Sequence, residues 1–202
     1  MLILASKSPR RQQLLRQAGV AFEVRPSKGP EAPWDGQEPP GDYVRRLALA
    51  KATEVSLTVM PRHPGAVVLG ADTVVALENR IFGKPKDLAE AKAMLRTLSG
   101  RGHTVYTGVA LVRDGQPLRV WTAATTVWFK PLTATEIDFY CGLAQPLDKA
   151  GAYGIQEHGE LIVERIEGLR SNVIGLPVEE VLAQRDLWEG EAWRTHEEAT
   201  GN

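Results

Sequence analysis

The run AVVLGADTVVAL, residues 66–77, constrains the fold of this chain more than any other stretch. Apart from Gly70 and Thr73, Asp72 is its only residue that is not apolar. A run of this kind is typical of a strand inside a sheet. We expect it to bend at Gly70 and to return through residues 78–80 into residues 81–85 as a hairpin. The Asp72 carboxylate then lies near the edge of the sheet with little access to solvent, where an unpaired charge is costly.

Two interpretations of Asp72 are open at this point. The first is a turn-forming aspartate between two short strands. The second is a carboxylate that binds a metal ion or accepts a proton, because ligand sites in open α/β sheets lie where strands end. We favour the second interpretation, since the surrounding residues are apolar and leave the acid without an evident structural partner.

The first residues of the chain predict a strand, a tight turn and a helix. The apolar run 1–5 stops at Ser6, Ser8 stands at an N-cap position, and Pro9 is the first residue of a helix that ends at Gly19. The free N–H groups at such a helix start attract oxyanions. This arrangement is therefore typical of a phosphate site.

Arg10 and Arg11 occupy the first turn of that helix. The helix dipole disfavours cations there by a few tenths of a kcal/mol, roughly, so both side chains could simply point into water. Together with the Ser8 hydroxyl, however, two guanidinium groups form a set suited to bidentate binding of phosphate. We predict that Ser8, Arg10 and Arg11 bind an anionic ligand.

The rest of the chain alternates predicted helices with hairpins, which indicates an α/β fold with a mixed sheet flanked by helices. Further strands are expected in a hairpin over 103–129 that turns at Asp114-Gly115, and over 160–168. The proline-rich segment 27–41 predicts an extended loop that could act as a lid. Residues 1–188 are expected to form one domain, followed by a polar tail over 189–202. The predicted later helices cover 42–59, 88–98 (with Asp87 and Glu90 at its start), 134–143 (with Thr133 and Glu136 at its start) and 177–188.

Composition excludes several classes of protein. The balance of 24 Lys and Arg against 25 Asp and Glu leaves a formal charge of -1, which gives no global reason to expect a nucleic acid or a membrane surface as partner. One cysteine, Cys141, cannot form an internal disulfide or a thiolate metal cage. No apolar run approaches the ~20 residues of a membrane helix. A soluble protein of the cytoplasm is expected.

Three lysines add candidate cations for the same site. Lys51 lies on the helix after the proline-rich loop, whereas Lys84 and Lys149 lie in glycine- and proline-rich loops where backbone can approach a ligand. A lysine is more often a solvated surface group, so each is weighed against that alternative. The chain has neither a G-x-x-x-x-G-K-[ST] loop nor a strand-borne G-x-G-x-x-G, which argues against a P-loop or a Rossmann fold.

Six blocks of sequence resemble the Maf family of nucleoside triphosphate pyrophosphatases. The resemblance implies an elongated fold with two lobes and a cleft, akin to the inosine triphosphate pyrophosphatases. It also implies hydrolysis of a nucleoside triphosphate to the monophosphate and pyrophosphate with Mg²⁺ or Mn²⁺, and a homodimer. The blocks run in order along nearly the whole chain: LASKSPRR, LGADTVV, GKPKD, LSGRGHTVYTGVAL, PLDKAGAYGIQ and SNVIGLP.

The resemblance assigns roles to individual positions. Asp72 is expected to accept the proton of the attacking water and to contact the metal. Lys51 and Lys84 are expected to neutralise charge on the phosphates. Of the acidic pair that usually follows the first βα unit, only Glu31 is present, so its part in binding metal is uncertain. The residues implied to bind substrate are Ser8, Arg10, Arg11, Lys51, Thr73, Lys84, Lys149 and Gln156.

Arg11, Thr73 and Gln156 are similar to the branch of the family that acts on dTTP and UTP. The Gln156 amide offers an acceptor and donors that match the N3–H and O4 of uracil or thymine. Rotated, it would match cytosine, so base selection needs a partner that fixes its orientation, for which Thr73 and Arg11 are the candidates. The alternatives to a pyrimidine pyrophosphatase are a nucleotide-binding regulator of division or septum formation, and a nucleic-acid-binding protein, against which the near-neutral charge speaks.

Overall fold

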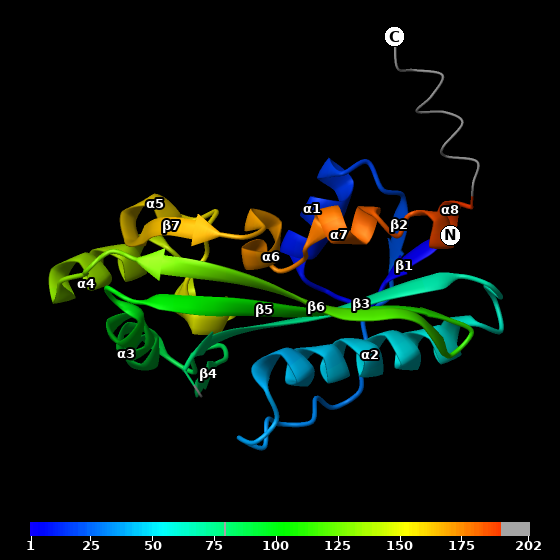
Figure 1. Ribbon diagram of the computed structural model, residues 1–202, viewed down its shortest axis with the longest axis horizontal. Helices are drawn as coiled ribbons and strands as arrows, with labels where there is room; N and C mark the ends of the chain where they lie inside the picture. Colours follow the sequence, from blue (N-terminus) through cyan, green and yellow to red (C-terminus); the bar gives the residue numbers. More distant parts are fainter. Residues whose placement is uncertain (79, 191–202) are drawn as a thin grey trace, which may run out of the picture.

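One mixed sheet organises the chain (Figure 1). The computed structural model describes residues 1–78 and 80–190. In this part the sheet has seven strands in the order β2-β1-β3-β5-β6-β7, with β4 paired to β3. β1 is parallel to β2 and β3, and the other pairs are antiparallel, so the mixed α/β sheet predicted from sequence is confirmed. The strands are β1 Leu2–Leu4, β2 Phe22–Val24, β3 Val67–Leu77, β4 Arg80–Phe82, β5 Gly102–Arg113, β6 Gln116–Phe129 and β7 Val163–Glu167.

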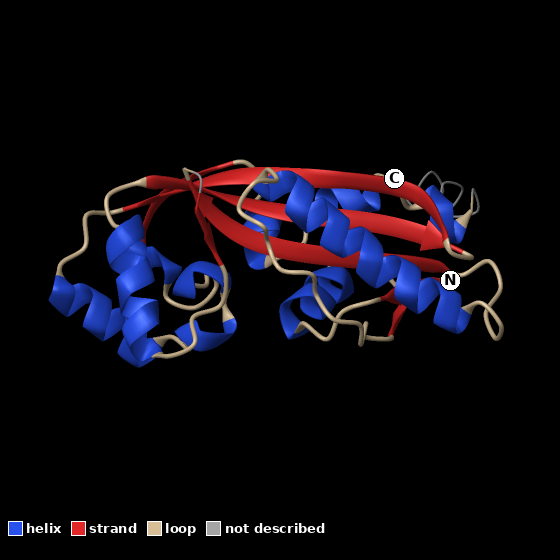
Figure 2. Cartoon of the chain, turned by 90° about the horizontal axis from the view of Figure 1, so that it is seen from below, coloured by secondary structure: helices blue, strands red, loops and turns tan. Residues whose placement is uncertain are grey.

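The helices gather in two groups at opposite ends of the sheet (Figure 2). α3, α4 and α5 cover one end, while α1, α7 and α8 lie on one face of the other end and α2 on its opposite face (Figure 1). The helices are α1 Pro9–Gln17, α2 Pro40–Val59, α3 Leu88–Leu98, α4 Ala134–Leu143, α5 Gly159–Ile162, α6 Arg170–Ile174, α7 Val178–Leu182 and α8 Asp186–Glu189, with single 3-10 turns at Pro146–Asp148 and Ala150–Ala152.

Three apolar clusters pack on this sheet and leave its middle polar. Val75 and Phe82 belong to the cluster under α3 and α4, Leu69 to the cluster under α1, and Val68 to the cluster under α2. Between them, Asp72 and Thr73 are the two half-buried positions of an otherwise buried β3. The boundary between the clusters therefore places these two polar side chains midway along the sheet.

The predicted bend at Gly70 is wrong, because β3 runs unbroken from Val67 to Leu77. Gly70 instead permits a close approach of α2: a Cβ there would stand 2.3 Å from the carbonyl oxygen of Ala48. Gly108, the partner of Asp72 in the register, would likewise place a Cβ 2.2 Å from the backbone of Val44. These two glycines let α2 lie almost against the sheet.

Several helix boundaries follow the sequence signals and others do not. Asp87 and Thr133 cap α3 and α4 through their side chains, and Thr133 forms a complete capping box with Glu136. Ser8 is the N-cap of α1, but its side chain makes no capping hydrogen bond. Within the described chain, α2 begins at Pro40 rather than at Asp42.

The largest errors of the sequence analysis lie near the C-terminus. The strand predicted over 160–168 exists as β7 over 163–167, but its first three residues belong to a short helix, α5. The predicted helix 177–188 consists of two short helices, α7 and α8, and the preceding α6 was not expected. α8 ends at Glu189, inside the predicted tail 189–202, and residues 191–202 of that tail lie outside the described residues.

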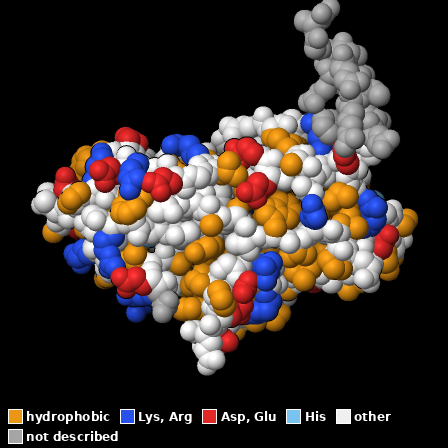
Figure 3. Space-filling view, in the orientation of Figure 1, with side chains coloured by type: hydrophobic (Ala, Val, Ile, Leu, Met, Phe, Trp, Pro, Cys, Tyr) orange, Lys and Arg blue, Asp and Glu red, His pale blue; other side chains and the backbone are white. Residues whose placement is uncertain are grey.

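The described helices include none that combines the length and the apolar character needed to cross a bilayer. On the face drawn in Figure 3, lysine and arginine side chains are interspersed with aspartate and glutamate. No continuous stripe of one sign runs across that face, in agreement with the near-neutral formal charge.

His103 is buried in the core beneath α3 and α4, and it makes stability depend on pH. Its Nε2 lies 2.8 Å from the Tyr153 hydroxyl and its ring packs edge-on against Phe129. Burial lowers the pKa of His103 to about 4. Between roughly pH 6.5 and 4 the unfolded chain therefore binds a proton at this site that the folded chain does not bind.

We expect the free energy of unfolding to fall as the pH drops through this window, with about 3 kcal/mol lost to His103 by pH 4. Urea unfolding at pH 7, 6 and 5 measures the slope. The His103→Phe variant cannot bind the proton, and its stability should fall less steeply. Equal slopes in the two proteins would contradict the assignment to His103.

Candidate functional site

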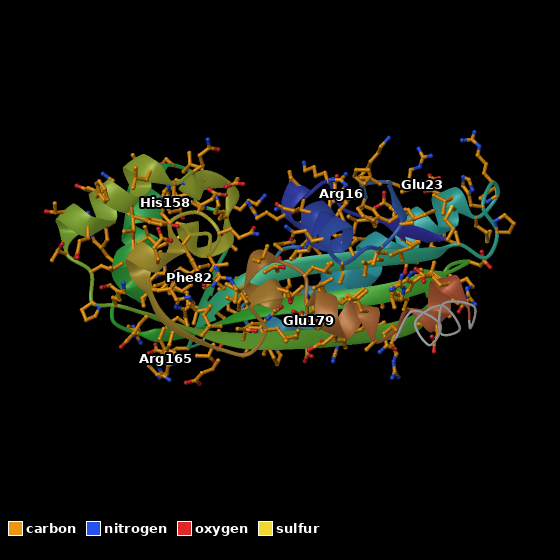
Figure 4. The ribbon with its side chains drawn as sticks, turned by 90° about the horizontal axis from the view of Figure 1, so that it is seen from above. Arg16, Glu23, Phe82, His158, Arg165 and Glu179 are labelled. Atoms are coloured by element: carbon orange, nitrogen blue, oxygen red, sulfur yellow. The ribbon has the colours of Figure 1, made fainter. Side chains whose placement is uncertain are left out.

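A cleft of about 1140 Å³ lies between the two groups of helices, over the polar middle of β3. Figure 4 views the molecule from above, with Arg16 on α1 on one side of this region and Phe82 and His158 on the other. Every residue that the sequence analysis selected lines this cleft: Ser8, Arg10, Arg11, Glu31, Lys51, Asp72, Thr73, Lys84, Lys149 and Gln156. The fold thus brings six separate segments of the chain to one cavity.

Lys51 joins two carboxylates at the floor of the cleft. Its Nζ lies 2.6 Å from Oδ1 of Asp72 and 2.7 Å from Oε1 of Glu31. The side chains of Asp72 and Lys51 are 13% and 15% exposed, whereas Glu31 is 59% exposed. The close approach of α2 at Gly70 explains this contact, because Lys51 precedes Ala52, the residue that Gly70 faces. The acid of β3 is therefore paired, and the pair opens into the cleft.

The hydrogen bond from Lys51 is the largest cause that lowers the pKa of Glu31, and partial burial opposes it. Charge from Lys84 and Arg11 lowers the same pKa further. Glu31 therefore remains an anion at lower pH than an ordinary glutamate. Two carboxylates from different segments thus face the ammonium of Lys51 in this site.

We expect the Lys51→Met variant to raise the pKa of Glu31, because it removes the strongest interaction with the ionised form. A ¹³C NMR titration of the Glu31 carboxyl group measures the change. Lys84→Met is the matched control and should produce a smaller rise, since Lys84 acts on Glu31 only through charge. A Glu31 pKa that is the same in the Lys51→Met variant and the native protein would contradict this account.

The guanidinium of Arg11 donates hydrogen bonds to three protein acceptors. Its Nε donates to the carbonyl of Gly175 at 2.8 Å, one terminal nitrogen to Ser6 Oγ at 3.1 Å and the other to Thr73 Oγ1 at 3.0 Å. Burial lowers the pKa of this guanidinium, and the charge of Asp72 partly offsets the effect. Arg11 and Thr73 therefore fix each other, together with the backbone at Gly175, at the centre of the cleft.

Asp148 links Arg10 to Lys149 across the mouth of the cleft. Arg10 donates to Oδ2 of Asp148 at 2.8 Å, and Lys149 Nζ lies 2.7 Å from Oδ1. Lys149 is 3% exposed and also contacts the carbonyl of Gln145 and the carboxylate of Glu157. Burial tends to raise the pKa of Asp148, but the hydrogen bonds from Lys149 and Arg10 bring it below its ordinary value. Lys149 thus fixes the loop around it.

Three other lysines of the cleft have no protein partner for their ammonium groups among the described residues. Within the described residues, the side chain of Lys84 makes no hydrogen bond or ion pair, and the same holds for Lys7 and Lys28. Ser8 also leaves its hydroxyl free at the start of α1. A basic surface with free donors therefore faces the Asp72 and Glu31 carboxylates.

Gln156 lines the cleft on a loop whose neighbouring residues are bound to the rest of the protein. The ammonium of Lys149 pairs with Glu157 at 2.8 Å, and Arg170 donates to the carbonyl of Ile155 at 3.3 Å. The residues on both sides of Gln156 are therefore attached to the rest of the protein. Its exposed amide side chain is left to face the cleft.

Asp148 and Glu157, which pair with cations of this cleft, were not selected from the sequence. Asp148 stands beside Lys149 in the PLDKAGAYGIQ block, which was a signal that could have been used. Its partner Arg10, however, is 138 positions away along the chain, so only the fold shows the pair.

The family model described as Maf-like protein matches residues 1–184 of this chain. The chain belongs to the Maf family. This confirms the resemblance seen in the six sequence blocks, and the Maf match covers the sheet, α1 to α7 and the whole cleft.

Three curated relatives of this Maf chain carry the name dTTP/UTP pyrophosphatase. A protein of that name from Moorella thermoacetica is 50% identical over 193 residues, which cover 93% of this chain and 97% of the relative. Another from Symbiobacterium thermophilum is 49% identical over 177 residues, with 88% of each chain covered. A third from Anaeromyxobacter dehalogenans is 48% identical over 185 residues and covers 90% and 91%.

A solved nucleoside-triphosphatase, a dITP/XTP pyrophosphatase from Mycobacterium abscessus, aligns with the Maf chain at a TM-score of 0.43 and 19% identity. The alignment covers 100% of this chain and 98% of that one. A likeness of this size supports no statement about the site.

Proposed function

We propose that this Maf protein hydrolyses dTTP and UTP to the nucleoside monophosphate and pyrophosphate. The observation that carries the proposal is the Asp72–Lys51 pair, 2.6 Å apart, in a cleft that also holds the start of α1 and Lys84. A carboxylate beside a cation serves chemistry on a phosphate, whereas simple binding needs no base. The names of relatives about 50% identical over most of their length support the same reaction.

In the proposed reaction, a water molecule attacks the α-phosphorus and the bond from that phosphorus to the bridging oxygen breaks. The Asp72 carboxylate accepts a proton from the water, and pyrophosphate leaves with the bridging oxygen. Lys51 and Lys84 neutralise charge on the phosphates. The hydroxyl of Ser8 and the free N–H groups of α1 hold phosphate oxygens at the other side of the cleft.

Glu31 and Asp72 fit a divalent cation of the Mg²⁺ or Mn²⁺ type. Mg²⁺ is commonly bound by one or two carboxylates together with phosphate oxygens and water, and this pair supplies the carboxylates. Among the described residues no cluster of three His, Cys, Asp or Glu is present, so the substrate must complete the donor set. When bound, the ion neutralises charge on the triphosphate.

The proposed roles of Arg11, Arg10 and Lys149 differ from direct phosphate contact. Arg11 and Lys149 use their donors on protein acceptors, and Arg10 is paired with Asp148. We propose that they shape the cleft, while Ser8 and Lys84 contact phosphate directly. Lys51 contacts phosphate through the one N–H of its ammonium that Asp72 and Glu31 leave free. Gln156 reads the uracil or thymine edge from a loop whose position is held by the contacts at Ile155 and Glu157.

Pyrophosphate release over a panel of nucleoside triphosphates, with Mg²⁺ and with Mn²⁺, tests this function. Turnover of dTTP and UTP should exceed that of the purine triphosphates. Tight nucleotide binding without release of pyrophosphate would favour the nucleotide-binding regulator instead. A homodimer stays a prediction from the resemblance, and a cytoplasmic location stays a prediction from the composition.

A further inference from the structure

Glu54 organises the beginning of the loop that leads to Glu31. It lies on α2 one turn after Lys51. Its Oε1 accepts a hydrogen bond from the backbone N–H of Lys28 at 2.9 Å, and its Oε2 accepts one from Gly29 N–H at 3.0 Å and another from the Ser27 hydroxyl. One carboxylate thus receives three donors from three consecutive residues.

The loop has little else to hold it at this point. A hollow of about 230 Å³ separates residues 27–31 from α2, lined on the helix side by Leu47, Ala50, Lys51 and Glu54. Because a cavity lies between the loop and the helix, apolar packing holds the two together only weakly here. The hydrogen bonds to Glu54 and the ion pair of Glu31 with Lys51 span the gap.

The other end of the loop is attached independently. Arg46 of α2 pairs with Glu38 at 2.6 Å, and Trp34 donates to the Glu38 carbonyl at 2.8 Å. In Figure 1 the whole segment lies alongside α2, between β2 and the start of that helix. The loop is therefore attached at two places. Glu54 holds its first part, which leads to Glu31, and Arg46 holds its second part.

We propose that Glu54 is a positioning residue, which holds residues 27–29 so that Glu31 presents its carboxylate to Lys51 and to the divalent cation of the proposed function. This inference rests on that function only for its metal step. The hydrogen bond from Ser27 and those from the two backbone N–H groups lower the pKa of Glu54, so it remains an acceptor at neutral pH. Groups that orient metal ligands commonly change metal affinity by roughly 10- to 100-fold when removed.

The test compares Glu54→Ala with Asp42→Ala. Both residues are acids on α2, Glu54 half-buried and Asp42 exposed, but the Asp42 carboxylate pairs with Arg45 on the same helix instead of meeting the loop. Amide hydrogen exchange at Lys28 and Gly29 measures how firmly Glu54 holds the loop. Mn²⁺ binding, followed by electron paramagnetic resonance with a non-hydrolysable dTTP analogue present, reads its effect on the metal.

In Glu54→Ala we expect faster exchange at both amides and Mn²⁺ affinity weaker by roughly tenfold. In Asp42→Ala we expect both to match the native protein. Glu54→Gln keeps one carbonyl acceptor, so its amide exchange rates and its Mn²⁺ affinity should lie between those of Glu54→Ala and the native protein. At saturating metal, kcat of Glu54→Ala should return close to the native value, because Glu54 touches neither metal nor substrate.

If amide exchange at Lys28 and Gly29 were unchanged in Glu54→Ala, the proposal that Glu54 holds this part of the loop on α2 would be wrong. Faster exchange with native Mn²⁺ affinity would overturn the link to Glu31. If the native protein released no pyrophosphate from any nucleotide, the proposed function would fail, while the exchange and Mn²⁺ measurements would still decide the role of Glu54.

Discussion

Replacing Asp72 by asparagine is expected to reduce pyrophosphate release from dTTP by roughly 10²- to 10⁴-fold, the usual contribution of a general base. The amide has the size of the carboxylate and can still accept the hydrogen bond of Lys51, now 2.6 Å from Oδ1. It cannot accept a proton from water. The loss should therefore appear in kcat, and the affinity for nucleotide should change much less.

Initial rates over a range of dTTP concentrations, at saturating Mg²⁺, measure this effect. Asp138→Asn is the matched control, because Asp138 is an exposed acid of α4 paired with Lys92, away from the cleft. It should keep native kinetics. Native turnover in Asp72→Asn would refute the assignment of Asp72 as the base.

Gly108→Ala is expected to lower the free energy of unfolding by about 3 kcal/mol, at the upper end of the usual effect of overpacking. The added Cβ would stand 2.2 Å from backbone atoms of Val44 and 2.4 Å from the backbone nitrogen of Arg45. Backbone inside a helix cannot move aside as a flexible side chain can, so α2 as a whole must shift. The same shift carries Lys51 away from Asp72, and activity should fall with stability.

Urea unfolding monitored by circular dichroism measures this loss. Gly142→Ala is the control, since a Cβ at Gly142 has no atom within 4 Å among the described residues. That change lies in α4 and should leave stability the same or raise it by up to about 1 kcal/mol, through a less flexible unfolded chain. Equal losses in the two variants would contradict the close approach of α2.

The sequence was informative where the signal is local. Proline at the start of α1, the capping residues Asp87 and Thr133, and the apolar run of β3 are properties of neighbouring residues, and each predicted its element. The short helices α5 and α6 were not predicted, because four or five residues carry too little periodicity to separate helix from strand. β2 was missed for the same reason, since it has three residues.

Gly70 shows how a local interpretation can fail. A glycine in a strand pattern indicates either a bend or a close approach of backbone, and residues 66–77 alone do not distinguish the two. The carbonyl of Ala48 decides the matter, and it comes from a helix that precedes the strand in the chain. The consequence is functional, because that close approach brings Lys51 to Asp72.

By itself, the sequence determined the family, the mixed α/β class and ten of the residues that line the cleft, because residue types in fixed local patterns carry that information. Only the tertiary structure decided which of those residues are free. Arg11 is bound to a carbonyl 164 positions away and Lys149 is enclosed by three acceptors, whereas Lys84 makes no such contact within the described chain. The physical reason is that the fold decides which acceptors lie within about 3 Å of a cation. For Arg11 two of these are 62 and 164 positions away, whereas for Lys149 they lie within its own loop, whose path is set by packing and not by local sequence.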